Sequence, residues 1–193
     1  MRAFLALPLP EALYNALERL QESIPGGSLI PPENFHRTLA FLGNQPEHAL
    51  DELHFALEAF RATAFEVRLK GLDTFGTPDP TNLHVAAEPS PALLDLHKRL
   101  KSVLHGAGIE LERTRFRPHV TLARYSKGLT PEDAIKLGRF LQARANTAFD
   151  PFVATEFTLY ESIQTKHGSL YEPLASYPLT PNKKAGPKPC LLR

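Results

Sequence analysis

Two stretches that repeat each other decide the fold of this chain: Phe35-His36-Arg37-Thr38-Leu39-Ala40-Phe41-Leu42 and Pro118-His119-Val120-Thr121-Leu122-Ala123-Arg124. In each stretch, a histidine and the threonine two positions later share one face of a predicted β-strand, and the leucine that follows the threonine lies on the opposite, buried face. His119 lies 83 positions after His36, and the same separation joins the two threonines. Because residues i and i+2 of a strand point to one face, each stretch projects an imidazole and a hydroxyl together.

The segments around these strands repeat in the same order. In the first unit we expect a strand over Arg2 to Pro8, a helix from Pro10, a helix from Pro46 to about Arg61 and a strand over Phe65 to Leu72. In the second unit we expect a strand over Leu83 to Ala87, a helix over Pro91 to His105, a helix over Pro131 to Ala145 and a strand over Phe152 to Glu161. The duplication predicts two pseudo-symmetric lobes with a cleft between them.

The expected domain covers residues 1–179 as a single unit. Its first repeat spans about 1–75, its second about 81–162, and a closing strand covers 170–179. Residues 180–193 read as a disordered tail because they are rich in lysine, proline and other non-core residues.

The composition suits a folded domain without a strong electrostatic field. With 193 residues and 42% apolar side chains, the chain can bury a core without a disulfide or a metal. Lys and Arg number 22 against 21 Asp and Glu, which excludes the bulk positive charge of nonspecific duplex-DNA binders. The single Cys190 suits a reducing cytosol, and no stretch approaches the roughly 20 apolar residues of a membrane span. We therefore expect a soluble, cytoplasmic protein, and a monomer.

Paired imidazoles suit phosphodiester hydrolysis, which needs a base for the attacking water and an acid for the leaving alkoxide. An unperturbed imidazole pKa of about 6.5 allows one ring to be neutral and the other protonated near neutral pH. The hydroxyls of Thr38 and Thr121 can donate hydrogen bonds to nonbridging phosphate oxygens. This chemistry predicts no metal and no other cofactor.

Two other interpretations of the histidine pair stay open. Both histidines could be satisfied core residues, although their shared strand context and repeat position argue against it. They could also bind a metal, but no Asp, Glu or Cys stands at ligand spacing beside either one, and threonine seldom binds zinc.

At these residues the chain resembles the two-histidine phosphoesterase superfamily, which is known for paired His-x-Thr-x motifs. Within it, the sequence is similar to the RNA 2',3'-cyclic phosphodiesterases, historically called 2'-5' RNA ligases. The likeness runs to Leu179 through the segments 2–8, 31–36, 116–124, 171–174 and 177–179. It implies an α+β, bilobal fold with an antiparallel sheet and helices in each lobe, a central cleft, and hydrolysis of cyclic phosphates on RNA ends or nucleotides to 2'-phosphates.

The resemblance also implies a role for each motif residue. His36 would be the proton donor to the departing 3'-oxygen, and His119 would be the proton acceptor that activates water. Thr38 and Thr121 would hold the phosphate.

Three further residues are candidates for substrate binding. Arg124, five positions after His119, corresponds to a family arginine that can clamp the phosphate. Phe41 and Tyr171 could stack on a nucleobase, although a core position is the simpler interpretation of each.

The chain departs from the family pattern at two places. The family often carries an aromatic residue shortly before Pro31, where this chain has Gly26 to Ile30 and no tryptophan anywhere. Arg37 stands where an apolar residue is common. Because Arg37 points away from the cleft, we expect its guanidinium to reach solvent or a carboxylate.

Other functions remain possible on the same residues. A 2'-5' RNA ligase or a phosphodiesterase of 2'-5' oligonucleotides would use the same site. A noncatalytic module that binds RNA ends belongs to another class, and the presence of both imidazoles argues against it.

Overall fold

The computed structural model describes residues 1–76, 78–112, 115–126, 128–166 and 168–181. Its first sheet has four antiparallel strands in the order β10-β9-β1-β3. These strands span Arg2–Pro8 (β1), His36–Asn44 (β3), Glu156–Thr165 (β9) and Gly168–Pro178 (β10). The N-terminal strand therefore lies inside the sheet, between a strand of the first repeat and one from the end of the chain.

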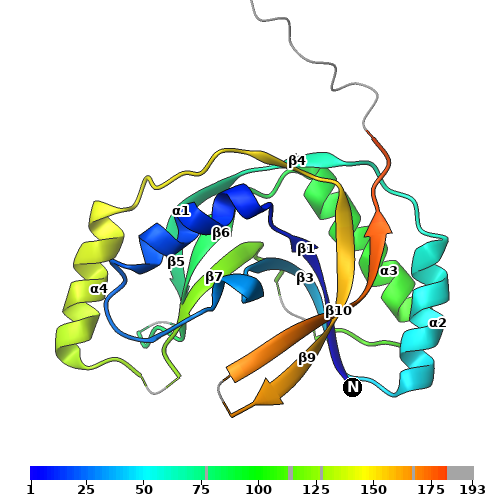
Figure 1. The fold of residues 1–193 in the computed structure, drawn as a ribbon, viewed down its shortest axis with the longest axis horizontal. Helices are drawn as coiled ribbons and strands as arrows, with labels where there is room; N and C mark the ends of the chain where they lie inside the picture. Colours follow the sequence, from blue (N-terminus) through cyan, green and yellow to red (C-terminus); the bar gives the residue numbers. More distant parts are fainter. Residues whose placement is uncertain (77, 113–114, 127, 167, 182–193) are drawn as a thin grey trace, which may run out of the picture.

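The second sheet has four antiparallel strands in the order β2-β7-β6-β5. They span Ser28–Leu29 (β2), Leu69–Phe75 (β5), Asn82–Ala87 (β6) and His119–Arg124 (β7). A short ribbon pairs β4, Phe65–Val67, with β8, Phe152–Ala154. The strands β3 and β7, which carry the two histidines, lie in contact although they belong to different sheets (Figure 1).

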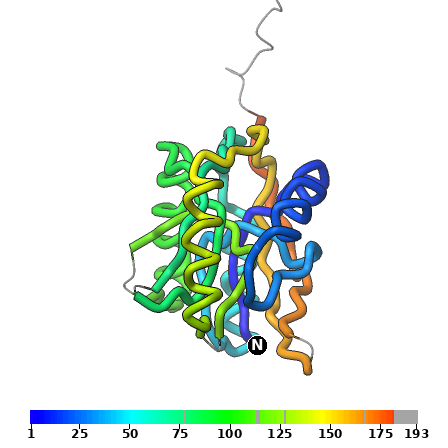
Figure 2. Tube along the Cα trace, turned by 90° about the vertical axis from the view of Figure 1, so that its left-hand side faces the viewer, coloured from blue at the N-terminus to red at the C-terminus, as the bar shows by residue number. Residues whose placement is uncertain are grey.

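The described part of the chain contains four α-helices, and proline stands at the start of each. They span Glu11–Gln21 (α1), Glu47–Glu58 (α2), Pro91–Gly106 (α3) and Pro131–Ala143 (α4). Proline fixes a backbone angle suited to a helix start and lacks the N–H that would go unpaired there. In Figure 1, α1 and α4 lie on one flank of the strands and α2 and α3 on the other. The view in Figure 2 places α1 and the β9–β10 hairpin on one side and α3 on the opposite side.

The two histidine strands have matching partners and matching registers. β3 pairs with β1, and β7 pairs with β6. In these two ladders three cross-strand residue pairs, or rungs, correspond, with a register shift after the second of them. The rungs are Pro8/His36, Ala6/Thr38 and Phe4/Phe41 in the first sheet, and Ala86/His119, His84/Thr121 and Asn82/Arg124 in the second. The backbone around the two motifs therefore repeats rung by rung.

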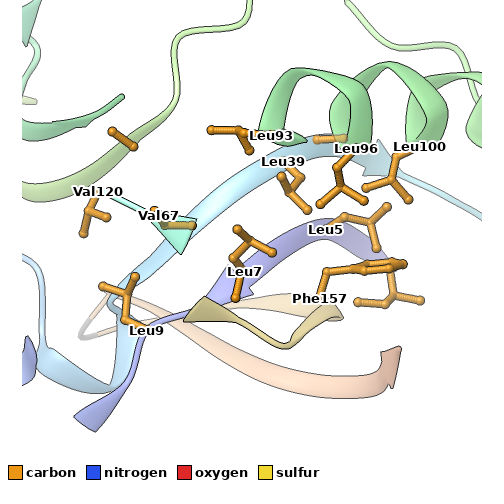
Figure 3. Packing of buried hydrophobic residues seen from close by; sticks show 14 of the residues in the cluster. Leu5, Leu7, Leu9, Leu39, Val67, Leu93, Leu96, Leu100, Val120 and Phe157 are labelled. Carbon is orange, nitrogen blue, oxygen red and sulfur yellow. The ribbon is translucent and has the colours of Figure 1, made fainter. Parts of the chain in front are cut away.

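A single large cluster of buried apolar residues anchors both histidine strands (Figure 3). Leu39, in β3, and Leu122, in β7, are buried there, three positions after the respective histidines. The inner face of α3 adds leucines at helical spacing, Leu93, Leu96, Leu100 and Leu104. Since the leucine face of each strand is fixed in the core, the histidine–threonine face must point the other way.

Two predicted strands are divided in the structure. The segment 65–72 breaks at Arg68 into β4 and β5, and the segment 152–161 breaks at Thr155 into β8 and β9. The short halves pair with each other, whereas the long halves enter the two large sheets. The prediction of undivided strands was wrong because hydrophobic alternation marks which face is buried and does not reveal a change of partner strand.

The C-terminal end of the described chain is held by the backbone. Thr180, the first residue of the expected tail, donates its N–H to the carbonyl of Ala62, and its own carbonyl accepts the N–H of Ala64, each at 2.8 Å. From residue 182 to residue 193, the expected tail lies outside the described residues. None of the helices that the structure describes is long and apolar enough to cross a bilayer.

Candidate active site

The two histidine–threonine pairs open on one cleft of about 190 Å³. All seven residues that the sequence analysis predicted for the site line this cleft. The complete lining is Ile30, Asn34, His36, Thr38, Phe41, Phe75, Asn82, His119, Thr121, Arg124 and Tyr171. Segments far apart in the sequence therefore converge on one small volume.

Both imidazoles are anchored through the same nitrogen. His36 Nδ1 lies 2.7 Å from the carbonyl oxygen of Asn34, and His119 Nδ1 lies 2.7 Å from the carbonyl oxygen of Arg117. Because a carbonyl only accepts, Nδ1 carries the hydrogen in each neutral ring and Nε2 keeps its lone pair. In the neutral ring of His36, Nε2 accepts a hydrogen bond from the hydroxyl of Thr38 at 3.1 Å. Each ring therefore keeps Nε2 as the nitrogen that can exchange a proton with a ligand.

A short turn that the sequence analysis missed fixes the carbonyl that holds His36. Residues Pro32–Asn34 form a 3-10 helix, which the N–H of Phe35 closes onto Pro32 at 2.9 Å. The side chain of Asn34 donates from Nδ2 to the carbonyl of Ser169 in β10 at 2.7 Å. Asn34 is thus tied to both β3 and the β9–β10 hairpin, and its backbone oxygen has little freedom to move.

Aromatic rings pack against both imidazoles. The rings of Phe4 and Tyr171 lie 4.8 and 5.0 Å from that of His36, with Tyr171 edge-on. On the other side of the cleft, the rings of Phe75 and His84 each lie 4.8 Å from that of His119. This packing restricts rotation of both imidazoles, so their Nε2 atoms are positioned before a ligand arrives.

Burial lowers the pKa of both histidines. Burial brings the pKa of His36 to about 4, against a backbone hydrogen bond that raises it, and the charges of His119 and Arg124 lower it further. Burial also lowers the pKa of His119, with smaller contributions from the charges of Arg37, Arg117 and Arg124. Both rings are therefore neutral at pH 7 while the cleft is empty. A bound anion would raise both pKa values because it stabilises the protonated ring.

The three candidate binding residues occupy the open end of the cleft. Arg124 is exposed at the end of β7, and its positive charge lowers the pKa of both histidines. Phe41 is 62% exposed, so the interpretation of Phe41 as a core residue was wrong. Tyr171 is half-buried, and its ring packs edge-on against the rings of His36 and Phe4 at 5.0 and 4.9 Å. All three are placed where a ligand between the histidines could touch them.

Arg37 does not lie where the sequence predicted. Its side chain is fully buried, at 0% exposure, and none of its three guanidinium nitrogens has a hydrogen-bond partner among the described residues. Its Cζ lies 5.9 Å from the centre of the Phe116 ring. The guanidinium does not reach the expected solvent because Arg37 follows the leucine face of β3 into the core. Burial lowers the pKa of the guanidinium to about 9.

Sequence analysis missed four residues that complete the site: Asn34, Phe75, Asn82 and His84. His84 is 2% exposed and lies behind His119, and Asn82 lines the cleft two positions earlier on β6. The alternation of Asn82 and His84 on one face was visible in the sequence, but only the pairing of β6 with β7 shows that this face looks into the cleft. No group of three His, Cys, Asp or Glu side chains suited to hold a metal occurs among the residues that the structure describes.

Three comparisons relate this arrangement to known proteins. An RNA 2',3'-cyclic phosphodiesterase of Geobacillus stearothermophilus is 32% identical over 183 residues, covering 91% of this chain but 56% of the relative. This chain therefore spans a little over half the length of that relative. An RNA 2',3'-cyclic phosphodiesterase of Aeropyrum pernix is 29% identical and covers 84% of this chain and 94% of its own length. A crystal structure of a Thermus thermophilus protein superposes with a TM-score of 0.74 at 28% identity, covering 92% and 97% of the two chains.

The family assignment follows from a match over most of the chain. The sequence model of the 2'-5' RNA ligase superfamily matches residues 9–164, a range that contains both histidine–threonine pairs and Arg124. Together with the α+β fold and its two antiparallel sheets, this match shows that the chain belongs to the 2'-5' RNA ligase superfamily of two-histidine phosphoesterases.

Proposed function

We propose that this protein hydrolyses the 2',3'-cyclic phosphate at RNA ends, or on nucleotides, to a 2'-phosphate. The observation that carries the proposal is the pair of histidines anchored through Nδ1 and turned with Nε2 toward one cleft, each beside a threonine hydroxyl. The names of the relatives from Geobacillus stearothermophilus and Aeropyrum pernix support the same substrate.

Two proton transfers through Nε2 account for the reaction. His119 takes a proton from water, and the water oxygen attacks phosphorus. The bond between phosphorus and the 3'-oxygen breaks, and His36 gives its Nε2 proton to that oxygen. The products are a 2'-phosphate and a free 3'-hydroxyl. Thr38, Thr121 and Arg124 donate hydrogen bonds to the nonbridging oxygens, which gain charge in the transition state.

The acid must gain its proton together with the substrate. A cyclic phosphate carries one negative charge, which raises the pKa of an adjacent imidazole and so favours proton uptake on binding. The role of His36 as the acid follows the family resemblance. The pKa of about 4 for His36 in the empty cleft favours the reverse assignment, in which His119 is the acid.

Turnover of a nucleoside 2',3'-cyclic monophosphate in EDTA tests the proposed function. We expect 2'-phosphate as the product and a loss of at least about a hundredfold in kcat for His36→Ala and for His119→Ala. His48→Ala, an exposed histidine of α2, is the matched control and should keep full activity. No turnover by the wild-type protein on mononucleotides or RNA ends would overturn the proposal. Tight binding of RNA ends without turnover would instead identify the noncatalytic module.

A substrate with sulfur in place of the 3'-bridging oxygen assigns the acid. A thiolate leaves without protonation, so the substitution should restore turnover only in the variant that lacks the acid. We expect rescue of His36→Ala and none of His119→Ala, and the opposite pattern would exchange the two roles.

The ligase alternative uses the same atoms with a 5'-hydroxyl in place of water. In dilute solution water is in large excess, so hydrolysis should dominate. Joining of RNA ends through 2'-5' linkages at a rate comparable to hydrolysis would favour the ligase. The cytoplasmic location and the monomeric state remain part of the proposal, and cell fractionation and sedimentation test them.

A further inference from the structure

The amide of Asn82 faces the cleft and takes no part in the mechanism above. Asn82 lies at the start of β6, directly opposite Arg124 in β7. Residues opposite each other in an antiparallel pair project to the same face, so the two side chains share one rung at the open end of the site. Both line the cleft.

Two neighbours fix the orientation of the Asn82 amide. The backbone N–H of Phe75 lies 3.3 Å from Asn82 Oδ1, and His84 Nδ1 lies 3.0 Å from the same atom. A backbone N–H can only donate, so the atom that it meets must be the amide oxygen. The amide nitrogen, Nδ2, therefore points away from both donors, and it makes no hydrogen bond to any described residue of the protein.

His84 serves as a fixed support for this amide. Its ring is 2% exposed and packs against Phe75 at 4.3 Å and against His119 at 4.8 Å. Burial lowers the pKa of His84 to about 4, and the charges of His119 and Arg117 lower it further, against Asp73, which raises it. The ring is therefore neutral near pH 7. Since Asn82 Oδ1 only accepts, the single N–H of His84 sits on Nδ1 and donates to it.

The corresponding rung of the first sheet carries no such donor. There, Phe4 and Phe41 occupy the positions that Asn82 and Arg124 occupy in the second sheet. The repeated backbone thus carries apolar rings at this rung of the first sheet, of which Phe41 lines the cleft, and N–H donors at the same rung of the second. A neutral amide beside a guanidinium, both donating, matches the oxygens of a phosphate group.

We propose that Asn82 is a substrate-binding residue that donates from Nδ2 to a phosphate oxygen beside Arg124, and that His84 is its positioning residue. This inference rests on the proposed function, because it takes the ligand of the cleft to be a phosphate ester. The phosphate is either the reacting cyclic group or the next phosphodiester of an RNA chain. A two-residue step along a strand is about 6.6 Å, so the Asn82 rung lies one short step from the Thr121 rung and both groups are within reach.

Asn82→Asp is the sharpest test, because aspartate keeps the acceptor for Phe75 and His84 but replaces the N–H donor by a negative oxygen. We expect kcat/KM for a cyclic mononucleotide to fall about a hundredfold, mainly through KM, if Asn82 binds the reacting phosphate. If it binds the next phosphodiester, the loss should appear only with a dinucleotide 2',3'-cyclic phosphate. Asn15→Asp, an exposed residue of α1, is the matched control. Values within about twofold of wild type on both substrates would overturn the proposal.

The new carboxylate could also act by neutralising Arg124, and a double variant separates this effect. Repeating Asn82→Asp in an Arg124→Ala background should still lower kcat/KM by about tenfold or more. A loss that disappears in that background would assign the whole effect to Arg124 and reject a contact by Asn82.

The role of His84 is tested by His84→Phe, which keeps a buried ring but removes the donor. We expect KM to rise several-fold with little change in kcat, and no further rise when His84→Phe is added to Asn82→Ala. Equal effects of His84→Phe in both backgrounds would show a structural role only.

Binding of inorganic phosphate, followed through the imidazole NMR signals of His36 and His119, provides a readout that does not need turnover. Asn82→Asp should weaken phosphate binding about tenfold or more if Asn82 contacts the reacting phosphate. If the wild-type protein binds phosphate but turns over no cyclic phosphate, the proposed function is refuted. The effect of Asn82→Asp on phosphate binding still tests the role of Asn82 in that case.

Discussion

Replacing Arg37 by methionine should stabilise the protein. The guanidinium is fully buried and makes no hydrogen bond to a described residue, so on folding it gives up the hydration of a cation without gaining an ion pair to any described side chain. Methionine has a similar length, is flexible enough to fill the same space, and carries no charge that must be dehydrated.

The pKa of Arg37 sets the upper bound of the effect. A fall from 12.5 to about 9 corresponds to roughly 5 kcal/mol, at about 1.36 kcal/mol per pKa unit. Because the pKa is depressed in the folded state, this penalty is fully present at every pH below about 9 and disappears only as the pH rises toward 12.5. Exchanges of buried ionic groups for apolar ones gain about 1 to 4 kcal/mol, so we expect the free energy of unfolding to rise by about that amount at pH 7.

Equilibrium unfolding in urea at pH 7 measures this change. Arg139→Met, an exposed arginine of α4, is the matched control and should change the free energy of unfolding by less than about 0.5 kcal/mol. A decrease of more than about 1 kcal/mol for Arg37→Met would refute the reasoning, since it would mean that the guanidinium makes stabilising interactions in the folded protein.

The same variant reports on the electrostatics of the site. The charge of Arg37 lowers the pKa of His119 and is not among the causes that act on His36. Removal of this charge should raise the pKa of His119 and leave that of His36 in place, which histidine NMR can follow. If His119 is the base, the acid limb of the kcat/KM profile moves to higher pH. A shift of both pKa values together would indicate that the variant has opened the cleft to water.

Three further predictions concern pH, base contact and backbone strain. Because the pKa of His84 is depressed to about 4, its contribution to stability is complete above pH 6.5 and is lost as the pH falls toward 4. When the pH is lowered from about 7 to 4.5, the free energy of unfolding in urea should fall by about 2 to 3 kcal/mol less for His84→Phe than for wild type. Equal falls in the two proteins would contradict this. Phe41→Ala should raise KM for RNA ends about tenfold with little change in the melting temperature, since most of the ring is exposed and can stack on a base; a clear fall in the melting temperature would mean that the contact of Phe41 with the ring of Phe4 stabilises the fold. Gly27→Ala should destabilise by about 1 to 3 kcal/mol in thermal unfolding, because φ is +77° and a Cβ would lie 2.5 Å from the ring of Tyr125; an unchanged melting temperature would show that the loop adapts.

The sequence was sufficient to predict the histidine pair as the acid–base candidates, because strand periodicity and repeat position point independently to the same side chains. A period of two places His36 with Thr38 and opposes both to Leu39, and the repeat imposes the same arrangement on His119 and Thr121. The structure then placed all seven nominated residues on one cleft. The helices were located within a few residues because proline marks each start.

The features that sequence reasoning missed depend on which strands become neighbours. His84 acquires its place only when β6 pairs with β7, and no local pattern states that pairing. The burial of Arg37 likewise depends on the tertiary packing around β3, since alternation alone predicts only that it turns away from the cleft. The breaks at Arg68 and Thr155 follow from a third pair of strands, β4 and β8, that neither repeat contains alone.

The repeated backbone creates two equivalent places for a histidine, and the neighbouring rungs make these places unequal. The aromatic rings of Phe4 and Tyr171 pack around His36. They add no charge, so burial is the main influence on the pKa of His36. Around His119 the ladder holds N–H donors and lies close to three arginines. An asymmetric substrate, with a base on one side of its phosphate and an oxygen-rich chain on the other, fits such a cleft in one orientation. In the proposed reaction, we therefore expect the Phe4–Phe41 and Asn82–Arg124 pairs to decide which histidine faces water and which faces the leaving oxygen.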